Sequence, residues 1–428
     1  MRPLRNSGRS HRGAVARSLA VAAWLAWCAA PAAAQDPAPA QTAAADVGEP
    51  LTLDAAIARA TAANPTIAAA RLGAAVDAAG LSVAAERPNP EATAEIEKET
   101  PRQSFGISVP LELGGKRARR VAVSQAAIRA GAADLEAVIA QVRADVRRGY
   151  FETVVAGERL SVLDDARRIA AQAATVSKTR FDDGDIPYLE VLQADLALAA
   201  AEAEVLTARG ALAASWAKLN ALLGQPSDRT RPLTTTADAS QAITAASALE
   251  QARGRSAELV ALDRRIDEQR AKVALARAMR VPDVAPGATL THGAEPEFTY
   301  GWRAGLTVTI PLFTTHKAGV TLEDATLAQL QAQRAALLQR VEGDVASAAA
   351  SAEAQRQAYL RYRDVIVPKA EQVERLALES FQSGQTGLPA LLLAFQATRD
   401  VRLRSLDAVG QFQSAVADLE RAVGAPLP

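Results

Sequence analysis

Apolar and polar residues alternate with a period of two in two separate parts of the chain. Over residues 105–113, Phe, Ile, Val and Leu alternate with Gly, Ser, Pro and Glu, and a shorter alternation covers residues 92–97. This period predicts half-buried strands, and the turn at Pro101 joins them into a β-hairpin at 91–113. A second hairpin is predicted at 284–313, where one strand face is apolar and the other carries Thr and Arg. Such strands are typical of membrane β-barrels, in which about 9 to 11 residues cross the bilayer.

Long segments with helical periodicity surround the two hairpins. Helices are predicted from residue 51 to about 86 and from about 247 to 282, each ended by proline. Much longer helices are predicted over 117–181 and 319–381, and each would extend on the order of 95 Å at about 1.5 Å per residue. Apolar residues spaced three and four apart predict coiled-coil seams that pair each long helix with the next one across a glycine turn. The predicted seams are Leu189, Leu192, Leu196, Ala199, Ala203 and Leu206 in the first copy, and Leu338, Val341, Val345, Ala348 and Ala352 in the second.

The same sequence pattern occurs twice, at a fixed offset of 200 residues. The segment from Arg180 to Gly184 returns from Ser380 to Gly384, and Gly224 returns as Gly424. A duplication this long predicts a fold built from two copies of one unit, with any function using both. The predicted boundaries are a first repeat at 51–226 with its helical tip near 181–188, a linker at 227–246, and a second repeat at 247–428 with its tip near 381–388. The predicted fold class is mainly α with a β-barrel part, made of long antiparallel helical hairpins and amphipathic strands.

The first 34 residues have the composition of an export signal. They contain five arginines, no acidic residue, and an apolar run over 19–30 that is followed by Pro31 and three alanines. The run is shorter than the roughly 20 residues that a membrane-spanning helix needs. We therefore predict a signal peptide at 1–34 and a flexible leader at 35–50. The only cysteine, Cys28, lies in this run and is either removed with the signal or lipidated. Removal leaves no thiol for a disulfide or an active site.

The remaining charged residues and histidines indicate no catalytic, metal-binding or nucleic-acid-binding site. Without the five arginines of the signal, 43 basic residues stand against 48 acidic ones, and no basic face argues for nucleic acid. His292 and His316 fall near opposite ends of the second hairpin, while a zinc site usually takes three or four ligands. The Gly-Gly-Lys-Arg segment at 114–117 lacks the first glycine and the Ser or Thr of a phosphate loop, which favours a strand-to-helix turn. We predict no enzyme activity, no cofactor and no dedicated metal site.

The order of elements resembles that of the TolC-type outer-membrane efflux proteins. The resemblance runs from Leu51 to the C-terminus and is carried by doubled motifs: the strand exits at 110–117 and 310–313, the tips around Gly184 and Gly384, and the helix ends at 222–226 and 422–426. The strand exits look most like those of the outer-membrane subunits of heavy-metal (cation) RND efflux systems. Residues 314–319 depart from that subgroup, which usually has an Asn/Gln-rich stretch there.

The resemblance implies an architecture, a location and partners. It implies a homotrimer in the outer membrane of a Gram-negative bacterium, with a shared barrel of twelve strands and a periplasmic tunnel of helical hairpins. Its implied partners are a periplasmic adaptor protein, an inner-membrane RND-type transporter and outer-membrane lipid. The implied function is the exit duct of a tripartite efflux pump for heavy-metal cations. Export of drugs and type I protein secretion are alternatives within this fold, and a soluble periplasmic coiled-coil scaffold is an alternative outside it.

Three groups of residues are candidates for function. The resemblance implies that the helical tips contact the adaptor, although their glycines also serve to reverse the chain; these residues are Arg180, Phe181, Gly184, Asp185, Phe381, Gly384 and Gln385. Three carboxylates share one turn, either as a ring that attracts cations or as a solvated helix end, namely Asp182, Asp183 and Asp185. Aromatic residues near strand ends form either a girdle at the membrane interface or ordinary packing, namely Phe105, Phe298, Tyr300 and Trp302.

Overall fold

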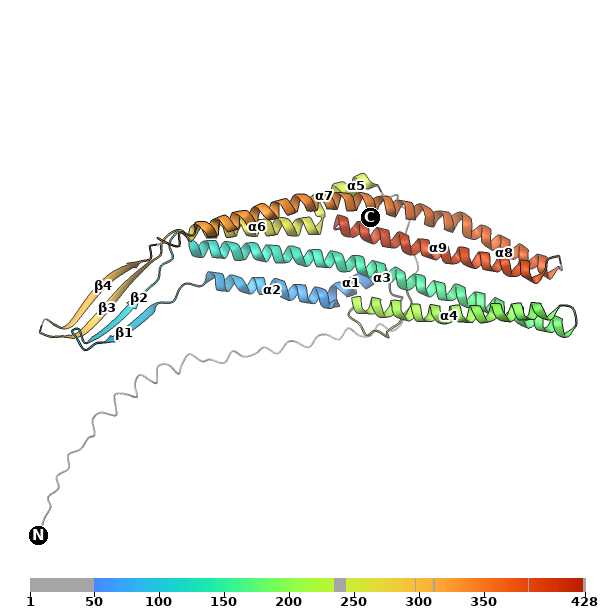
Figure 1. The fold of residues 1–428 in the computed structure, drawn as a ribbon, viewed down its shortest axis with the longest axis horizontal. Coiled ribbons are helices and arrows are strands. Elements are labelled where there is room, and N and C mark those ends of the chain that lie inside the picture. The colour runs from blue at the N-terminus through green and yellow to red at the C-terminus, as the bar shows by residue number, and fades with distance from the viewer. Residues whose placement is uncertain (1–49, 235–243, 297, 311, 384, 426–428) are drawn as a thin grey trace, which may run out of the picture. The chain divides into compact units, whose positions relative to one another are not determined.

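The computed structural model describes residues 50–425 apart from 235–243, 297, 311 and 384. The predicted signal peptide and leader lie outside these residues, except for Pro50. The described part is mainly helical, with one four-stranded antiparallel sheet beyond the ends of long helices, which confirms the predicted fold class (Figure 1). Its helices are α1 (Leu53–Ala63), α2 (Pro65–Ala85), α3 (Lys116–Asp182), α4 (Tyr188–Leu222), α5 (Ala245–Arg255), α6 (Ala257–Ala278), α7 (Lys317–Arg361), the π-helical turn η1 (Tyr362–Ile366), α8 (Val367–Gln382) and α9 (Leu388–Val423).

Each repeat begins with two helices where the sequence pattern predicts one. Asn64 has an extended backbone, and its side-chain oxygen accepts hydrogen bonds from the backbone N–H groups of Thr66 and Ile67 at 2.8 and 3.2 Å. It therefore caps α2, and Pro65 takes the first helical position, where its missing N–H has no partner to lose. Ser256 occupies the same place between α5 and α6, 192 residues later. The predictions of unbroken helices over 51–86 and 247–282 are wrong at these two points.

In each repeat, one glycine follows the last helix and packs against the break between the first two helices. Gly224 and Gly424 have positive φ angles of +64° and +78°. A Cβ on Gly224 would lie 2.4 Å from the carbonyl oxygen of Ala63, and one on Gly424 would lie 2.3 Å from that of Arg255. The duplication seen in the sequence therefore extends to equivalent backbone contacts.

Two apolar cores lie at equivalent places in the repeats. Leu219 and Leu419, 200 residues apart, are both completely buried, the first among α1, α3 and α4 and the second among α5, α7 and α9. Tyr150 of α3 connects the first core to the beginning of the repeat and to the linker. Its hydroxyl donates to the carbonyl of Leu51 at 2.7 Å and accepts from the backbone N–H of Thr234 at 3.0 Å.

The long helices run as predicted, with one irregularity. α3 is unbroken over 67 residues. In the second repeat, η1 separates α7 from α8, immediately before Pro368. The segments at 142–146 and 341–345 are 199 residues apart whereas the tips are 200 apart, so the second repeat holds one additional residue in the stretch that contains η1. A π-helical turn accommodates such a residue because its hydrogen bonds span five residues instead of four.

The predicted seam is correct in the second repeat and wrong in the first. Val341, Val345 and Ala352 are buried. The predicted leucines of α4 are instead exposed, from 47% for Leu192 to 71% for Leu196. The buried face of α4 is shifted by two residues, about 200° round the helix, and so lies nearly opposite the predicted one. It has smaller side chains that allow a closer approach to α3: Val191, Ala194, Ala201, Val205 and Ala208.

The strands form one sheet in the order β1-β2-β3-β4, with β1 and β4 at its edges. They are β1 (Glu91–Ile96), β2 (Gln103–Ser108), β3 (Val284–Ala294) and β4 (Phe298–Val308). β3 and β4 have 11 residues each and β1 and β2 have 6, so the predicted strand ends at 113 and 313 are wrong. Regular pairing of β2 ends at Ser108, and Pro110 has no N–H to donate. The N–H of Leu111 nevertheless donates to the carbonyl of Val284 at 2.7 Å.

The register of the strands separates the side chains into an apolar and a polar face. Phe105 pairs with Leu290, which pairs with Trp302, so these residues form one row across the sheet. The next row carries Thr289 and Arg303, which therefore lie on the opposite face. The described strands thus have the amphipathic alternation predicted for them.

Candidate functional site

The two helical tips reverse the chain with the same backbone hydrogen bonds. At the first tip, the N–H of Asp185 donates to the carbonyl of Arg180 at 2.8 Å. At the second, the N–H of Gln385 donates to the carbonyl of Ser380 at 2.9 Å. Gly184 has a φ of +82°, in the left-handed region that closes such a turn without steric cost in glycine. Its counterpart Gly384 lies outside the described residues.

The side chains at the two tips point to different surroundings. Phe181 and Tyr188 are both exposed and form a tilted ring pair with centroids 5.4 Å apart. Phe381 is half-buried and faces the space between the two helical hairpins. Arg180 and Gln385 are exposed. The sequence analysis did not select Tyr188, although an aromatic residue directly after Pro187 at a helical tip could have identified it as a candidate contact residue.

The three tip carboxylates remain in solvent. Asp182, Asp183 and Asp185 are exposed, and within the described residues no ion pair neutralises them. The structure brings them together in one turn, so their negative charge is concentrated at the end of the first hairpin. No such group occurs at the described positions of the second tip, where Ser383 and Gln385 are polar but uncharged.

A cavity of about 630 Å³, which we call the hairpin cavity, lies between the first and second helical hairpins near their tips. Its wall is apolar, with Glu374 as its one charged residue. α3, α8 and α9 supply the lining, which includes Ala173, Val176, Leu378, Phe381, Leu391 and Phe395. The sequence pattern does not reveal this cavity because it depends on how far apart the two hairpins pack.

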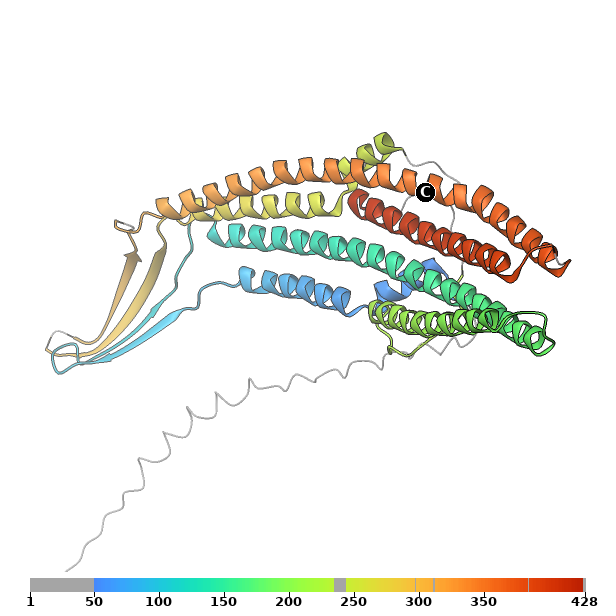
Figure 2. The ribbon, with the colours of Figure 1, turned by 45° about the vertical axis from the view of Figure 1, so that its right-hand side comes forward.

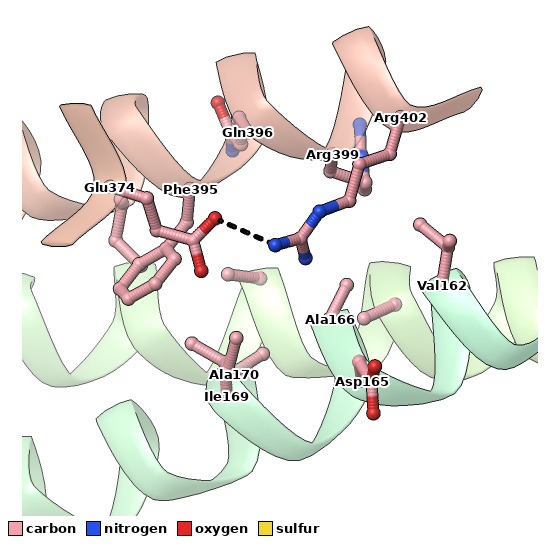
Figure 3. A pocket seen from close by; sticks show the side chains of 13 residues that line it. Val162, Asp165, Ala166, Ile169, Ala170, Glu374, Phe395, Gln396, Arg399 and Arg402 are labelled. Carbon is pink, nitrogen blue, oxygen red and sulfur yellow. Dashed lines mark ion pairs between the residues drawn. The ribbon is translucent and has the colours of Figure 1, made fainter. Parts of the chain in front are cut away.

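A neighbouring pocket with charged residues in its lining shares Glu374 and Phe395 with the hairpin cavity and lies on the side away from the tips (Figure 3). Arg402 of α9 reaches toward Glu374 of α8 at 3.6 Å. Arg399 lies within 3.1 Å of Glu204 of α4 and thereby joins the second hairpin to the first. Further along the same helices, Arg147 of α3 pairs with Glu420 of α9 at 2.8 Å. Ion pairs therefore connect the two hairpins along the helices, whereas the hairpin cavity nearer the tips has an apolar lining.

A compact junction connects the sheet to the helices. Gly114 and Gly115 both have positive φ angles, and Lys116 begins α3 directly after them. The Nζ of Lys116, whose side chain is 6% exposed, lies 2.7 Å from Oδ2 of Asp283 at the start of the second hairpin. Asp283 also accepts a hydrogen bond from the N–H of Leu113 at 3.1 Å. The lysine therefore stabilises a strand-to-helix turn, which is the structure that the sequence favoured over a phosphate loop at this segment.

The candidate aromatic residues all lie on the apolar face of the sheet. Tyr300 and Trp302 of β4 are 69% and 82% exposed, and Phe105 of β2 shares a row with Trp302. Phe298 is exposed on the same face, next to the turn between β3 and β4. From Tyr300 to Val308 the apolar face extends about 26 Å at roughly 3.3 Å per residue. At the tilt of about 40° that is typical of outer-membrane strands, this length covers about 20 Å of an apolar band that is about 25 Å tall.

The sequence profile of the family called outer membrane efflux protein matches residues 56–225 and 248–425. This chain belongs to that family. The two matched segments coincide with the two structural repeats, and membership confirms the resemblance drawn from the doubled motifs. It also confirms an outer-membrane location.

Two curated relatives are resistance proteins for metals. The chain is 26% identical over 383 residues to the cobalt-zinc-cadmium resistance protein CzcC of Cupriavidus metallidurans, covering 88% of this chain and 90% of that protein. It is 26% identical over 244 residues to the nickel-cobalt-cadmium resistance protein NccC of Alcaligenes xylosoxydans xylosoxydans, covering 55% of this chain and 52% of that one. Among solved structures, the CmeC outer membrane channel of Campylobacter jejuni matches with a TM-score of 0.72 at 17% identity, covering 87% of this chain and 85% of that one. CusC matches with a TM-score of 0.71 at 16% identity, covering 87% and 92%. These structures share the fold.

Proposed function

We propose that this chain is the outer-membrane exit duct of a tripartite efflux pump that exports divalent heavy-metal cations. The observation that carries the proposal is the match to CzcC over nearly the whole chain, on a fold that combines amphipathic strands with long helical hairpins. The duct supplies a path and a gate, and an inner-membrane RND-type transporter supplies the energy. No catalytic residue or cofactor is part of this proposal.

The proposed duct is a homotrimer. The sheet has four strands, and β1 and β4 leave unpaired backbone groups at its edges. In lipid such groups have no water to bond, so membrane-spanning sheets must close. Single-chain barrels of the outer membrane have about 8 strands or more, and three copies of this sheet would supply twelve. In this arrangement Phe105, Phe298, Tyr300 and Trp302 form a girdle at the membrane interface.

The helical tips are the proposed docking site for the periplasmic adaptor protein. Residues of both tips would form the contact: Arg180, Phe181, Gly184, Asp185, Phe381, Gly384 and Gln385. The hydrophobic Phe181–Tyr188 pair is the largest exposed aromatic group at the first tip. The uncompensated carboxylates of Asp182, Asp183 and Asp185 would raise the local concentration of cations at the tunnel mouth.

The test is the growth of a deletion strain across divalent metals and hydrophobic drugs, with and without the gene restored. Selective sensitivity to zinc, cobalt or cadmium that the restored gene reverses would support the proposal. Drug sensitivity with unchanged metal tolerance would instead indicate a drug exit duct. A restored chain carrying Phe181→Ala should retain its outer-membrane level but lose cross-linking to the adaptor, and loss of both would indicate misfolding.

A further inference from the structure

Exposed basic residues gather where the helices meet the sheet. Four connections join the two, and both views place them between the sheet and the helical layer (Figures 1 and 2). They are residues 86–90 after α2, 109–115 before α3, 279–283 after α6 and 309–316 before α7. Each connection contains or borders an exposed basic side chain, and we call these five residues the junction cluster: Arg87, Arg117, Arg119, Arg280 and Lys317.

Hydrogen bonds and an ion pair hold the four connections at one level. The Nε of Arg117 donates to the carbonyl of Ala85, at the end of α2, at 2.7 Å. The ion pair of Lys116 with Asp283, at 2.7 Å, joins the start of α3 to the start of β3. The N–H of Thr309, after β4, donates to the carbonyl of Asp283 at 3.3 Å. The junction cluster therefore lies together at the sheet end of the helical layer.

The junction cluster is a local excess of positive charge in a chain that is otherwise slightly acidic. Two acidic residues of the four connections are already paired, Glu112 with Arg120 and Asp283 with Lys116. The third, Glu86, is exposed. Among the described residues, no ion pair includes a member of the junction cluster. Its charges are therefore not neutralised within the chain and are available to an anion outside it.

Exposed apolar side chains border the junction cluster on the side of the sheet. The alternation of the strands' apolar face continues past the paired residues to Leu113 and Leu312, which are both exposed. Phe313 is 99% exposed, and Val281, directly after Arg280, is exposed as well. An apolar surface that ends at a row of long basic side chains fits the boundary between hydrocarbon and headgroups, where such side chains keep their charged ends in the polar layer.

The length of the strands places the junction cluster at the edge of the bilayer in the proposed barrel. An apolar band of about 25 Å, crossed at a tilt of about 40°, takes about ten residues at roughly 3.3 Å each. Counted from Tyr300, such a band ends at Ile310. The headgroup layer of roughly 5–8 Å follows it. Leu312 and Lys317 come next in the sequence, so the junction cluster lies at the level of the headgroups on the periplasmic side.

We propose that the junction cluster binds the phosphate groups of anionic phospholipids in the periplasmic leaflet of the outer membrane. This inference rests on the proposed barrel and adds to it a class of lipid and the depth at which the chain sits. Each Lys or Arg near an anionic membrane surface strengthens binding about fivefold. Four of the five residues are arginines, whose forked N–H donors match the oxygens of a phosphate.

The test is the binding of single lipids to the purified full chain in detergent, measured by native mass spectrometry. The probes are dioleoyl phosphatidylglycerol and dioleoyl phosphatidylethanolamine, which share acyl chains and differ in net charge. We expect the wild type to prefer phosphatidylglycerol, and Arg119→Gln/Arg280→Gln/Lys317→Gln to weaken its binding by on the order of a hundredfold at low salt. The preference of the wild type should decrease as salt rises, because exposed charges are screened.

Two further variants separate the junction from charge in general. Lys178→Gln/Arg209→Gln/Arg375→Gln is the matched control, because it removes three exposed charges from helices that do not adjoin the sheet, and it should keep the preference. Lys98→Gln/Arg102→Gln removes exposed charges at the opposite end of the sheet and should also keep it. Loss of the preference in this last variant, with the junction variant unaffected, would place the lipid in the other leaflet and overturn the proposal.

Lipid binding and transport are measured independently. A wild type that does not prefer phosphatidylglycerol, or a junction variant that binds it as the wild type does, would overturn this inference and leave the exit duct intact. A clear lipid preference in a chain that does not restore metal tolerance would overturn the exit duct and support this inference. The conservative Arg119→Lys/Arg280→Lys variant should retain the preference, since it keeps both charges, and its loss there would count against an electrostatic contact.

Discussion

Replacement of Gly224 by alanine tests the close contact between the end of α4 and the break between α1 and α2. The backbone at Gly224 has a φ of +64°, and a Cβ there would lie 2.4 Å from the carbonyl oxygen of Ala63. The left-handed conformation costs a non-glycine residue about 1–2 kcal/mol. Relieving an overpacked contact costs roughly 1–3 kcal/mol more. We therefore expect Gly224→Ala to destabilise the chain by about 2–5 kcal/mol.

The assay is the loss of helical circular dichroism at 222 nm on heating the detergent-purified protein, at one fixed scan rate. Gly210→Ala is the matched control, because that glycine lies inside α4 with no atom within 4 Å of its Cβ position. It should be neutral or stabilising by about 0.5–1 kcal/mol, as alanine is in helices. Gly424→Ala should lower the unfolding midpoint as Gly224→Ala does, since its Cβ would lie 2.3 Å from the carbonyl oxygen of Arg255. Equal unfolding midpoints for the Gly224 and Gly210 variants would refute the reasoning.

Three further predictions follow from the sheet and the first core. Leu306→Arg, on the apolar face of β4, should cost about 2–4 kcal/mol in the membrane and reduce the outer-membrane fraction, whereas Thr307→Arg on the polar face should not; equal losses would contradict the assigned faces. Tyr150→Phe removes the donor to Leu51 and the acceptor for the N–H of Thr234. It should cost about 1–3 kcal/mol and speed proteolysis of the linker, and an unchanged digestion rate would count against the contact. Burial raises the pKa of Tyr150 above its usual value, so the unfolded chain loses this proton first, and stability should fall as the pH rises above about 10 in wild type and less in Tyr150→Phe.

The sequence predicts those features that depend on local pattern. The period of two gave both hairpins, because alternation is set by the pleat of each strand. The end of β2 was missed because regular strand pairing stops at Ser108, before Pro110, whereas the alternation of the sequence continues to Leu113. The break at Asn64 was accessible, since an asparagine cap followed by Pro65 is a strong helix start. Its equivalent at Ser256 lacks the proline and is found only by carrying the first repeat over.

The sequence pattern does not show which face of α4 is buried or which charged residues pair between the hairpins. α4 is rich in both leucine and alanine, so two stripes at helical spacing compete, and only the position of α3 decides that Val205 is buried and Leu206 exposed. The pair of Arg399 with Glu204 joins residues 195 positions apart. Such pairs depend on how the hairpins pack, which no spacing in the sequence specifies.

The differences between the repeats carry more information about assembly than their similarities. The proposed homotrimer needs contacts between copies in addition to the contacts inside the chain. The internal α3–α6 contact is held together by the covalent chain, so a polar contact with the Arg265–Asp134 pair, whose side chains are 56% and 39% exposed, is sufficient. The contact between copies must also offset the loss of translational and rotational freedom, and a buried ion pair contributes little to that because its charges must be desolvated. An uncharged, apolar surface such as the exposed side of α2 with Leu72, Val76 and Val83 is what this physical difference favours.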